Sequence, residues 1–407
     1  MADDTSLEAA VPAARRAVPP VVRDDGAATD LCAALFAEFR RYDQRIRARQ
    51  YLDGLLYARG RKSIANIAGA VGVPGDAQRL HHFVSSSHWA WSPVRRALAA
   101  FLEEDGAPAA WVVLPVSIPK AGEHSVGVSR HLSSDGGQVV HGQQAYGMWY
   151  ASERVVAPVS WRLHIPDAWL RNRRRRTGTE AADELHAATP DACVAGLCGD
   201  VRRWGDPARP VVMDARGAGQ EHHLTGLFGA GSPAVVRIGG HTPLLSDEPG
   251  RSGPGEQPAA AGALLGAARR LRCVLRRPGR PEPARGRPVA MATAAVRLPH
   301  LRGAAGGAPG AAGRLQLVGV WHDLRRPPAE VWLTNAADLP AVSVLRTTRL
   351  IDAVQGAWRT RGEAVGLRDY GGRSFQGWHR HMTLASCAYA LSSLRSAGPV
   401  HCPELSA

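Results

Sequence analysis

The stretches Trp111-Val112-Val113-Leu114 and Val211-Val212-Met213-Asp214 decide the fold of this chain. Each is a short apolar run, typical of a strand that is buried on both faces of a sheet. Two longer runs, 139–150 and 155–163, follow the first stretch and predict two more strands with a turn between them. A fifth strand is predicted over 234–238, after the second stretch.

Helical patterns separate the later strands. Residues 181–203 and 224–228 are predicted helices, and two more helices, 342–362 and 377–394, close the chain. Three strands, a helix, and then alternating strand and helix is the order of a ribonuclease H-like mixed sheet, so we expect an α/β fold. We expect this core to be built from 108–245 and 315–395.

The segments outside this core differ from it in composition. Residues 1–28 are rich in Ala, Pro and charge and are predicted to be disordered, and 29–107 is predicted to be a helical domain. Within it, 63–84 resembles a helix-turn-helix, whose second helix carries Arg79 and would enter the major groove of DNA. An ordinary helical hairpin explains this pattern equally well.

A second unusual segment, 246–314, interrupts the core with Gly, Pro, Ala and Arg. Between Gly266 and Arg314 there are 11 arginines and a single acidic residue, Glu282. We expect an inserted subdomain that binds DNA or a partner protein, although drift in a GC-rich gene also explains the composition. Residues 396–407 are expected to be a tail.

The charge balance indicates the kind of partner. The 407 residues include 50 Lys+Arg and 36 Asp+Glu, a formal net charge of +14. Such an imbalance favours nucleic acid first and anionic membrane surfaces second. No apolar run is long enough to predict a membrane span, and the six cysteines are scattered as in a reduced, cytosolic protein. We therefore expect a cytoplasmic, nucleoid-associated protein.

Three segments together point to a family. Residues 118–128 read IPKAGEHSVGV, residues 211–215 read VVMDA, and residues 366–381 read GLRDYGGRSFQGWHRH. In this order they resemble the DDE-type transposases of bacterial insertion sequences, the DDE-superfamily endonucleases of the insertion-sequence-four-like superfamily. The resemblance extends over about residues 30–395, and its C-terminal signature is the most specific part.

The resemblance implies a metal site that this chain does not complete. Members of the family use two aspartates and a glutamate to hold two Mg²⁺ ions at the scissile phosphodiester. Here Asp214 stands at the second position, but Leu114 and Pro115 occupy the first and Gly371 the third. We therefore expect Asp214 to be a vestigial ligand, the sole candidate for a metal, and the chain to be a pseudoenzyme without a cofactor. The alternative is an active Mg²⁺-dependent transposase with Glu123 and Asp369 as surrogate carboxylates.

The expected partner is double-stranded DNA, bound by a homodimer as in many transposases of this class. A packed role is the alternative for the two histidines near the last helix, and a solvated loop is the alternative for the arginine run at 171–176. The candidate DNA-binding residues are Lys120, Arg79, Arg173, Arg174, Arg175, Arg373, His379, Arg380 and His381. Such a protein is either a retained regulator or a decayed insertion-sequence remnant.

Overall fold

The computed structural model describes residues 26–72, 77–104, 106–133, 137–171, 188–205, 207–217, 223–247, 257–267, 273–275, 289–299, 314–336 and 340–396. The predicted tails lie outside these residues, apart from 26–28 and 396, which belong to the first and last helices. Most of the arginine-rich insertion also lies outside them, as do Arg173, Arg174 and Arg175.

Five strands form the centre of the molecule: β1 (Ala110–Pro119), β3 (Val139–Ala151), β4 (Val156–Leu163), β5 (Val211–Asp214) and β6 (Ala234–Ile238). β3 pairs antiparallel with both β1 and β4, whereas β5 runs parallel to β1 and β6 parallel to β5. These are the five strands expected from the apolar runs, in the order of a ribonuclease H-like sheet. The predicted fold class is confirmed.

The sheet continues beyond β6 through strands that the sequence only partly predicts. These strands are β12 (Glu330–Thr334), β11 (Leu315–Trp321), β10 (Val289–Arg297), β7 (Pro243–Ser246), β8 (Ala259–Ala260) and β9 (Cys273–Leu275). At the opposite side of the sheet, β2 (Val128–Leu132) pairs with β3. β10 lies within the predicted insertion, yet it pairs with β11 over seven residues from Ala290 to Val296. Part of this segment therefore continues the sheet rather than interrupting it. The sequence VAMATAAVR is rich in alanine, which has a low strand propensity, so pairing with β11 defines the strand.

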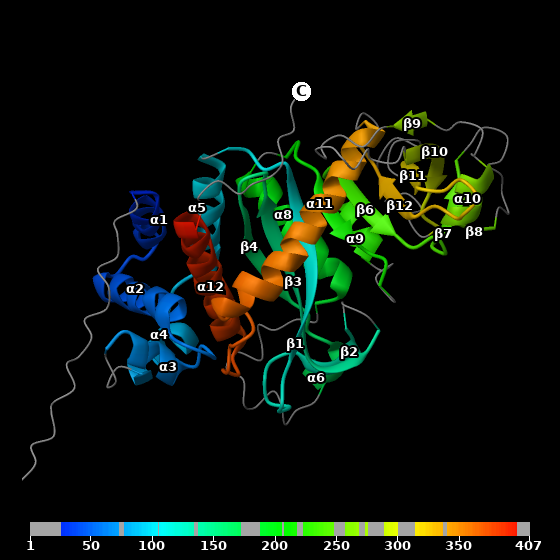
Figure 1. Cartoon of the computed structure of the whole chain (residues 1–407). Coiled ribbons are helices and arrows are strands. Elements are labelled where there is room, and N and C mark those ends of the chain that lie inside the picture. The colour runs from blue at the N-terminus through cyan, green and yellow to red at the C-terminus, as the bar shows by residue number, and fades with distance from the viewer. Residues whose placement is uncertain are drawn as a thin grey trace, which may run out of the picture.

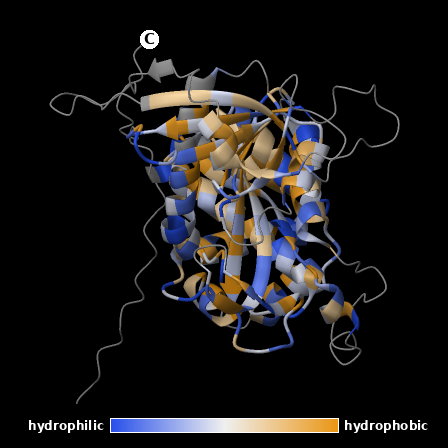
Figure 2. Cartoon of the chain, turned by 90° about the vertical axis from the view of Figure 1, so that its right-hand side faces the viewer, coloured by the Kyte–Doolittle hydropathy of each residue, from blue (hydrophilic) through white to orange (hydrophobic). Residues whose placement is uncertain are grey.

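Helices cover the sheet, and one of them crosses the two strands that carry the expected site. The helices of the core are α6 (Asp167–Arg171), α8 (Pro190–Trp204), α9 (His223–Gly229), α10 (Ala261–Ala267), α11 (Ala341–Ala357), the π-helical turn η4 (Trp358–Gly362) and α12 (Phe375–Ser396). α11 runs diagonally across the strands and contacts both β1 and β5 (Figure 1). Hydrophobic residues concentrate on the strands in the interior, whereas the helices carry residues of both kinds (Figure 2).

The N-terminal helices share the core with the end of the chain. They are α1 (Gly26–Ala37), α2 (Tyr42–Tyr57), α3 (Ile64–Ala70), α4 (Ala77–Ser85) and α5 (Trp91–Glu104). α1, α2, α4 and α5 contact α12, and buried side chains such as Leu35, Leu98 and Leu384 belong to one continuous cluster. The helices predicted over 29–107 therefore exist, but they enclose α12 and do not have a separate core.

Candidate active-site edge

The candidate site lies where the carboxyl end of β5 meets the middle of β1, which continues beyond the predicted run at 111–114 as far as Pro119. Val113 pairs in register with Met213, so the next residues, Leu114 and Asp214, stand side by side. Residues in register on parallel strands point to the same face of a sheet. An apolar leucine, only 7% exposed, therefore lies beside the aspartate, at the position where the resemblance expects the first acid.

The carboxylate of Asp214 is engaged by an arginine two residues further along the chain. Nη2 of Arg216 lies 2.6 Å from Oδ2, Nε lies 2.9 Å from Oδ1, and the backbone N–H of Arg216 donates to Oδ1 at 3.1 Å. The pKa of Arg216 is raised, first by the hydrogen bond to Asp214 and further by the charges of Asp214, Glu330 and Asp352. Sequence reasoning missed Arg216, although its spacing from Asp214 suits a local ion pair.

A second arginine borders the same edge. Arg237 pairs in register with Asp214 on the neighbouring strand β6, and its Nη2 lies 3.9 Å from Oε1 of Glu330. The Arg237 guanidinium also stands over the ring of Trp332, 5.7 Å from its centroid. Trp332 in turn donates from Nε1 to Oε2 of Glu330 at 3.1 Å. Strands β5, β6 and β12 thus place alternating charges along this edge.

Gly371, which occupies the position expected for the third acid, does not lie beside Asp214. Lys120 donates from Nζ to the backbone carbonyl of Tyr370 at 2.6 Å, and Lys120 follows Leu114 by six residues. Six residues of strand span about 20 Å, so the loop that contains Gly371 lies near the far end of β1 and away from Asp214. On α11, the carboxylate of Asp352 is near enough to Arg216 to contribute to the raised pKa of Arg216.

Neither predicted surrogate carboxylate lies at this edge. Asp369 accepts a hydrogen bond from the backbone N–H of Lys62 at 2.7 Å, beside the start of α3. Glu123 is exposed in the loop after Lys120, beyond the far end of β1. The pairing of Glu123 and Asp369 with Asp214 is therefore wrong for this conformation.

Three residues of the C-terminal signature are packed rather than presented to DNA. His379, Arg380 and His381 are 2%, 4% and 1% exposed, because α12 is covered by the N-terminal helices. Arg380 donates to three backbone carbonyls at the end of α4 and just before α5. The predicted DNA contacts of these side chains are wrong, and the packed alternative holds for both histidines.

The remaining described candidates keep surfaces that DNA can reach. Lys120 is half-buried, and burial, followed by the charge of Arg61, lowers its pKa to about 8. Arg373 is exposed just before α12, and Arg79 is exposed on α4. Their contacts with DNA remain predictions.

The helices α3 and α4 occupy the segment that resembles a helix-turn-helix, and residues 73–76 between them lie outside the described ranges. Ser63 caps α3 by accepting a hydrogen bond from the backbone N–H of Asn66 at 3.2 Å. On α4 one face is buried through Leu80, Phe83 and Val84, and the other carries the exposed side chains of Gln78, Arg79, His81 and His82. This second helix therefore presents a polar face away from the core.

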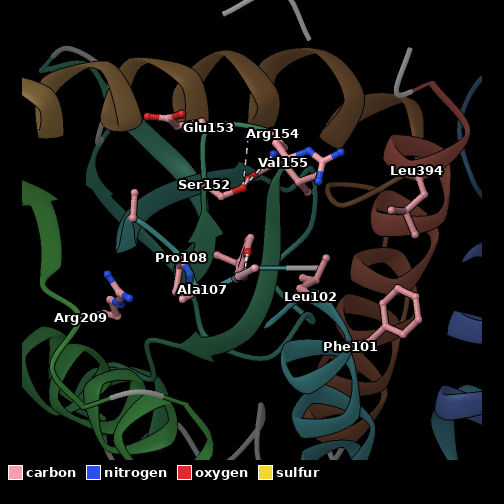
Figure 3. A pocket seen from close by; sticks show the side chains of 13 residues that line it. Phe101, Leu102, Ala107, Pro108, Ser152, Glu153, Arg154, Val155, Arg209 and Leu394 are labelled. Atoms are coloured by element: carbon pink, nitrogen blue, oxygen red, sulfur yellow. Dashed lines mark hydrogen bonds between the residues drawn. The ribbon is translucent and has the colours of Figure 1, made fainter. Parts of the chain in front are cut away.

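Two cavities lie away from Asp214. One, of about 220 Å³, lies between α3, α4 and the loop of Asp369 and Gly371. The other, of about 320 Å³, lies at the amino end of β1, with Arg154 and Arg209 on opposite sides (Figure 3). Because Asp214 stands at the carboxyl end of its strand, neither cavity is the expected cleavage site.

The side chains at the edge do not fit a two-metal centre. Mg²⁺ takes oxygen ligands, but Leu114 offers none and Asp214 is already bound by a guanidinium. Within the described ranges, no group of three or more His, Cys, Asp or Glu side chains is arranged to hold a metal ion. No step of metal-dependent cleavage can be derived from these residues.

This mixed sheet, with an aspartate at the end of β5, is consistent with the ribonuclease H-like fold of DDE nucleases. The family model described as "DDE superfamily endonuclease" matches residues 34–294, more than half of the chain, and the protein belongs to this family. Membership of this family implies nucleic-acid binding. No curated protein matches the sequence. In the described part of the chain, every helix is too short or too polar to cross a membrane.

Proposed function

We propose that this protein is a transposase-like DNA-binding protein that does not cleave DNA. The observation that carries the proposal is the register of β1 and β5, which places Leu114 beside Asp214, the residue that ends β5. Cleavage in this family needs several carboxylates to hold Mg²⁺ at the scissile phosphate. Here one of those positions is a leucine, and the neighbouring aspartate is neutralised by Arg216.

Charge supports DNA as the partner. A net charge of +14 favours phosphate backbones, which attract arginine and lysine through counterion release. The exposed face of α4, with Gln78 and Arg79, has the form of a recognition helix. We propose that α4 reads the sequence and that the surface arginines hold the backbone, with a homodimer as the binding unit.

Cleavage is tested on supercoiled plasmid with Mg²⁺ or Mn²⁺. We expect no nicking by the wild-type protein above the level of the Asp214→Asn variant. Nicking by the wild type that the variant lacks would contradict the proposal and support the alternative, an active transposase.

DNA reading is tested by incubating the protein with sheared genomic DNA and sequencing the bound fraction. We expect a preferred sequence, and we expect Arg79→Ala to lose that preference by about tenfold in affinity, which corresponds to a base contact of 1–3 kcal/mol. Arg96→Ala, an exposed arginine on α5, is the control. Equal enrichment by wild type and Arg79→Ala would contradict a recognition role for α4.

The genomic positions of the bound sequences distinguish a retained regulator from a decayed insertion-sequence remnant. Binding at promoters away from its own gene is expected of a retained regulator. Uniform, salt-sensitive binding is expected of a decayed remnant, because phosphate contacts carry no sequence information.

A further inference from the structure

Carboxylates gather at the edge of the sheet that holds Asp214, and their negative charge opposes the binding of DNA there. The carboxylates of Asp214 and Glu330 both lie at this edge, Asp214 2.6 Å from Arg216 and Glu330 3.9 Å from Arg237. Carboxylates on a surface repel a phosphate backbone that approaches them. In a metal-dependent site the bound cations would neutralise them, but the side chains present here do not fit such a site.

Arg216 has the geometry of a fixed cation at this edge. Its Nε and Nη2 atoms both contact the Asp214 carboxylate, at 2.9 and 2.6 Å, and paired contacts of this kind are strong and well oriented. The backbone N–H of Arg216 donates to the same carboxylate at 3.1 Å, so both the backbone and the side chain of Arg216 bind Asp214. The Asp214 side chain is only 14% exposed, whereas that of Arg216 is 48% exposed.

The neighbouring charges are arranged in the same way. Glu330 is 8% exposed and lies beside Arg237, which is itself next to Asp214 in the sheet. Each of the two covered carboxylates at the edge thus has an arginine beside it. Arg216 is the more exposed of these two cations, with 48% against 12% for Arg237.

We propose that Arg216 is an internal counter-ion that takes over the neutralising role of a divalent metal, so that DNA can lie along this edge in the absence of metal. Asp214 then acts as the positioning residue for Arg216. The inference rests on the proposed DNA binding. It adds that DNA binds at the Asp214 edge and that this binding does not require a divalent metal.

The test is a set of affinities for duplex DNA measured by fluorescence anisotropy. The wild type is expected to bind equally in EDTA and in MgCl₂ at matched ionic strength. Arg216→Ala is expected to bind about tenfold more weakly, because Asp214 is left uncompensated. The double variant Asp214→Asn/Arg216→Ala is expected to return to within about twofold of the wild type, because the repulsive charge is gone as well.

Arg203→Ala is the matched control. Arg203 is also an exposed arginine paired with an aspartate at 2.7 Å, Asp200, but on α8. It should lower affinity by about twofold at most, the effect of one distant charge. Thermal melting of each variant verifies that it is folded.

Each other result has a definite meaning. A double variant as weak as Arg216→Ala would overturn the counter-ion role and indicate a direct phosphate contact. Wild-type binding that requires Mg²⁺ and is lost in Asp214→Asn would overturn it in favour of a metal site. Unchanged binding by Arg216→Ala would overturn the inference alone, whereas a wild type that binds no duplex would overturn the proposed function along with it.

Discussion

The ring of His381 is held on both sides within the core. Its Nδ1 lies 2.8 Å from the hydroxyl of Tyr51, and its Nε2 lies 2.8 Å from the backbone carbonyl of Gly366. A neutral ring with its proton on Nε2 satisfies both partners, since the tyrosine donates and the carbonyl accepts. Burial lowers the pKa of His381 to about 4, against the opposing effect of the Gly366 hydrogen bond. The signature histidine therefore joins α2 to α12 as a neutral group.

We predict that stability falls as the pH is lowered from 7 to 5. Over this range the unfolded chain takes up a proton on His381, whose unperturbed pKa is near 6.5, whereas the folded ring stays neutral down to about 4. The unfolded state then binds more protons, so the free energy of unfolding drops by about 2 kcal/mol on account of this ring. Urea unfolding at the two pH values measures the drop.

The His381→Gln variant should lose about 2 kcal/mol of this pH-dependent drop. It should also be less stable than the wild type at pH 7. His82→Gln, at an exposed position on α4, is the control and should show the wild-type dependence. Identical pH dependence in His381→Gln and wild type would contradict the assignment of the proton to His381.

At the scale of elements, the long β1–β3 pair depends on a glycine. Gly142 lies opposite Pro119 on β1 and opposite Ser129 on β2, so it stands between two strands. A Cβ atom at Gly142 would collide with the backbone carbonyl of Ile118, which cannot move without breaking the ladder. The β1–β3 pair therefore needs glycine at this position.

We predict that Gly142→Ala destabilises the protein by about 2 kcal/mol, the usual range for overpacking against backbone. Gly122→Ala is the matched control, because its Cβ would meet nothing within 4 Å. Both are measured by urea unfolding. Equal stability of the two variants would show that β1 and β3 separate at this point without cost.

At the scale of the whole molecule, the N-terminal helices and the last helix form one unit. Arg95 of α5 is 1% exposed and donates to Thr383 Oγ1 at 2.8 Å and to the carbonyl of Trp161 at 2.9 Å. It also reaches Nδ1 of His379 at 3.1 Å. A buried guanidinium with these partners joins α5, α12 and β4.

We therefore predict that the core does not fold without the N-terminal helices. A chain that lacks residues 26–107 would expose the apolar side of α12 and leave His379 without Arg95 and His381 without Tyr51. It should show no cooperative thermal transition by circular dichroism, in contrast to the full chain. A cooperative transition of the shortened chain would establish two separable domains.

Sequence patterns were sufficient for the strands that are buried on both faces. The runs at 111–114, 211–214 and 234–238 are continuous apolar stretches because helices and sheet neighbours cover both sides of these strands. β2, β7, β8, β9 and β10 were missed, and β2 and β10 are the longest of these. The first has the half-exposed sequence VSRHL and the second is rich in alanine, so pairing with β3 and β11 defines them.

For the candidate site, the sequence by itself determined that Asp214 ends a short buried strand, because an apolar run precedes it. The resemblance assigned Leu114 to the first acidic position, and the register of β1 and β5 places it beside Asp214. Only the tertiary structure decided the rest: that Gly371 lies far from Asp214, that three signature residues are core residues, and that Arg216 holds Asp214. The physical reason is that these facts depend on how α11, α12 and the N-terminal helices pack. Packing brings together residues that are far apart in the sequence, and their spacing along the chain does not predict the contact.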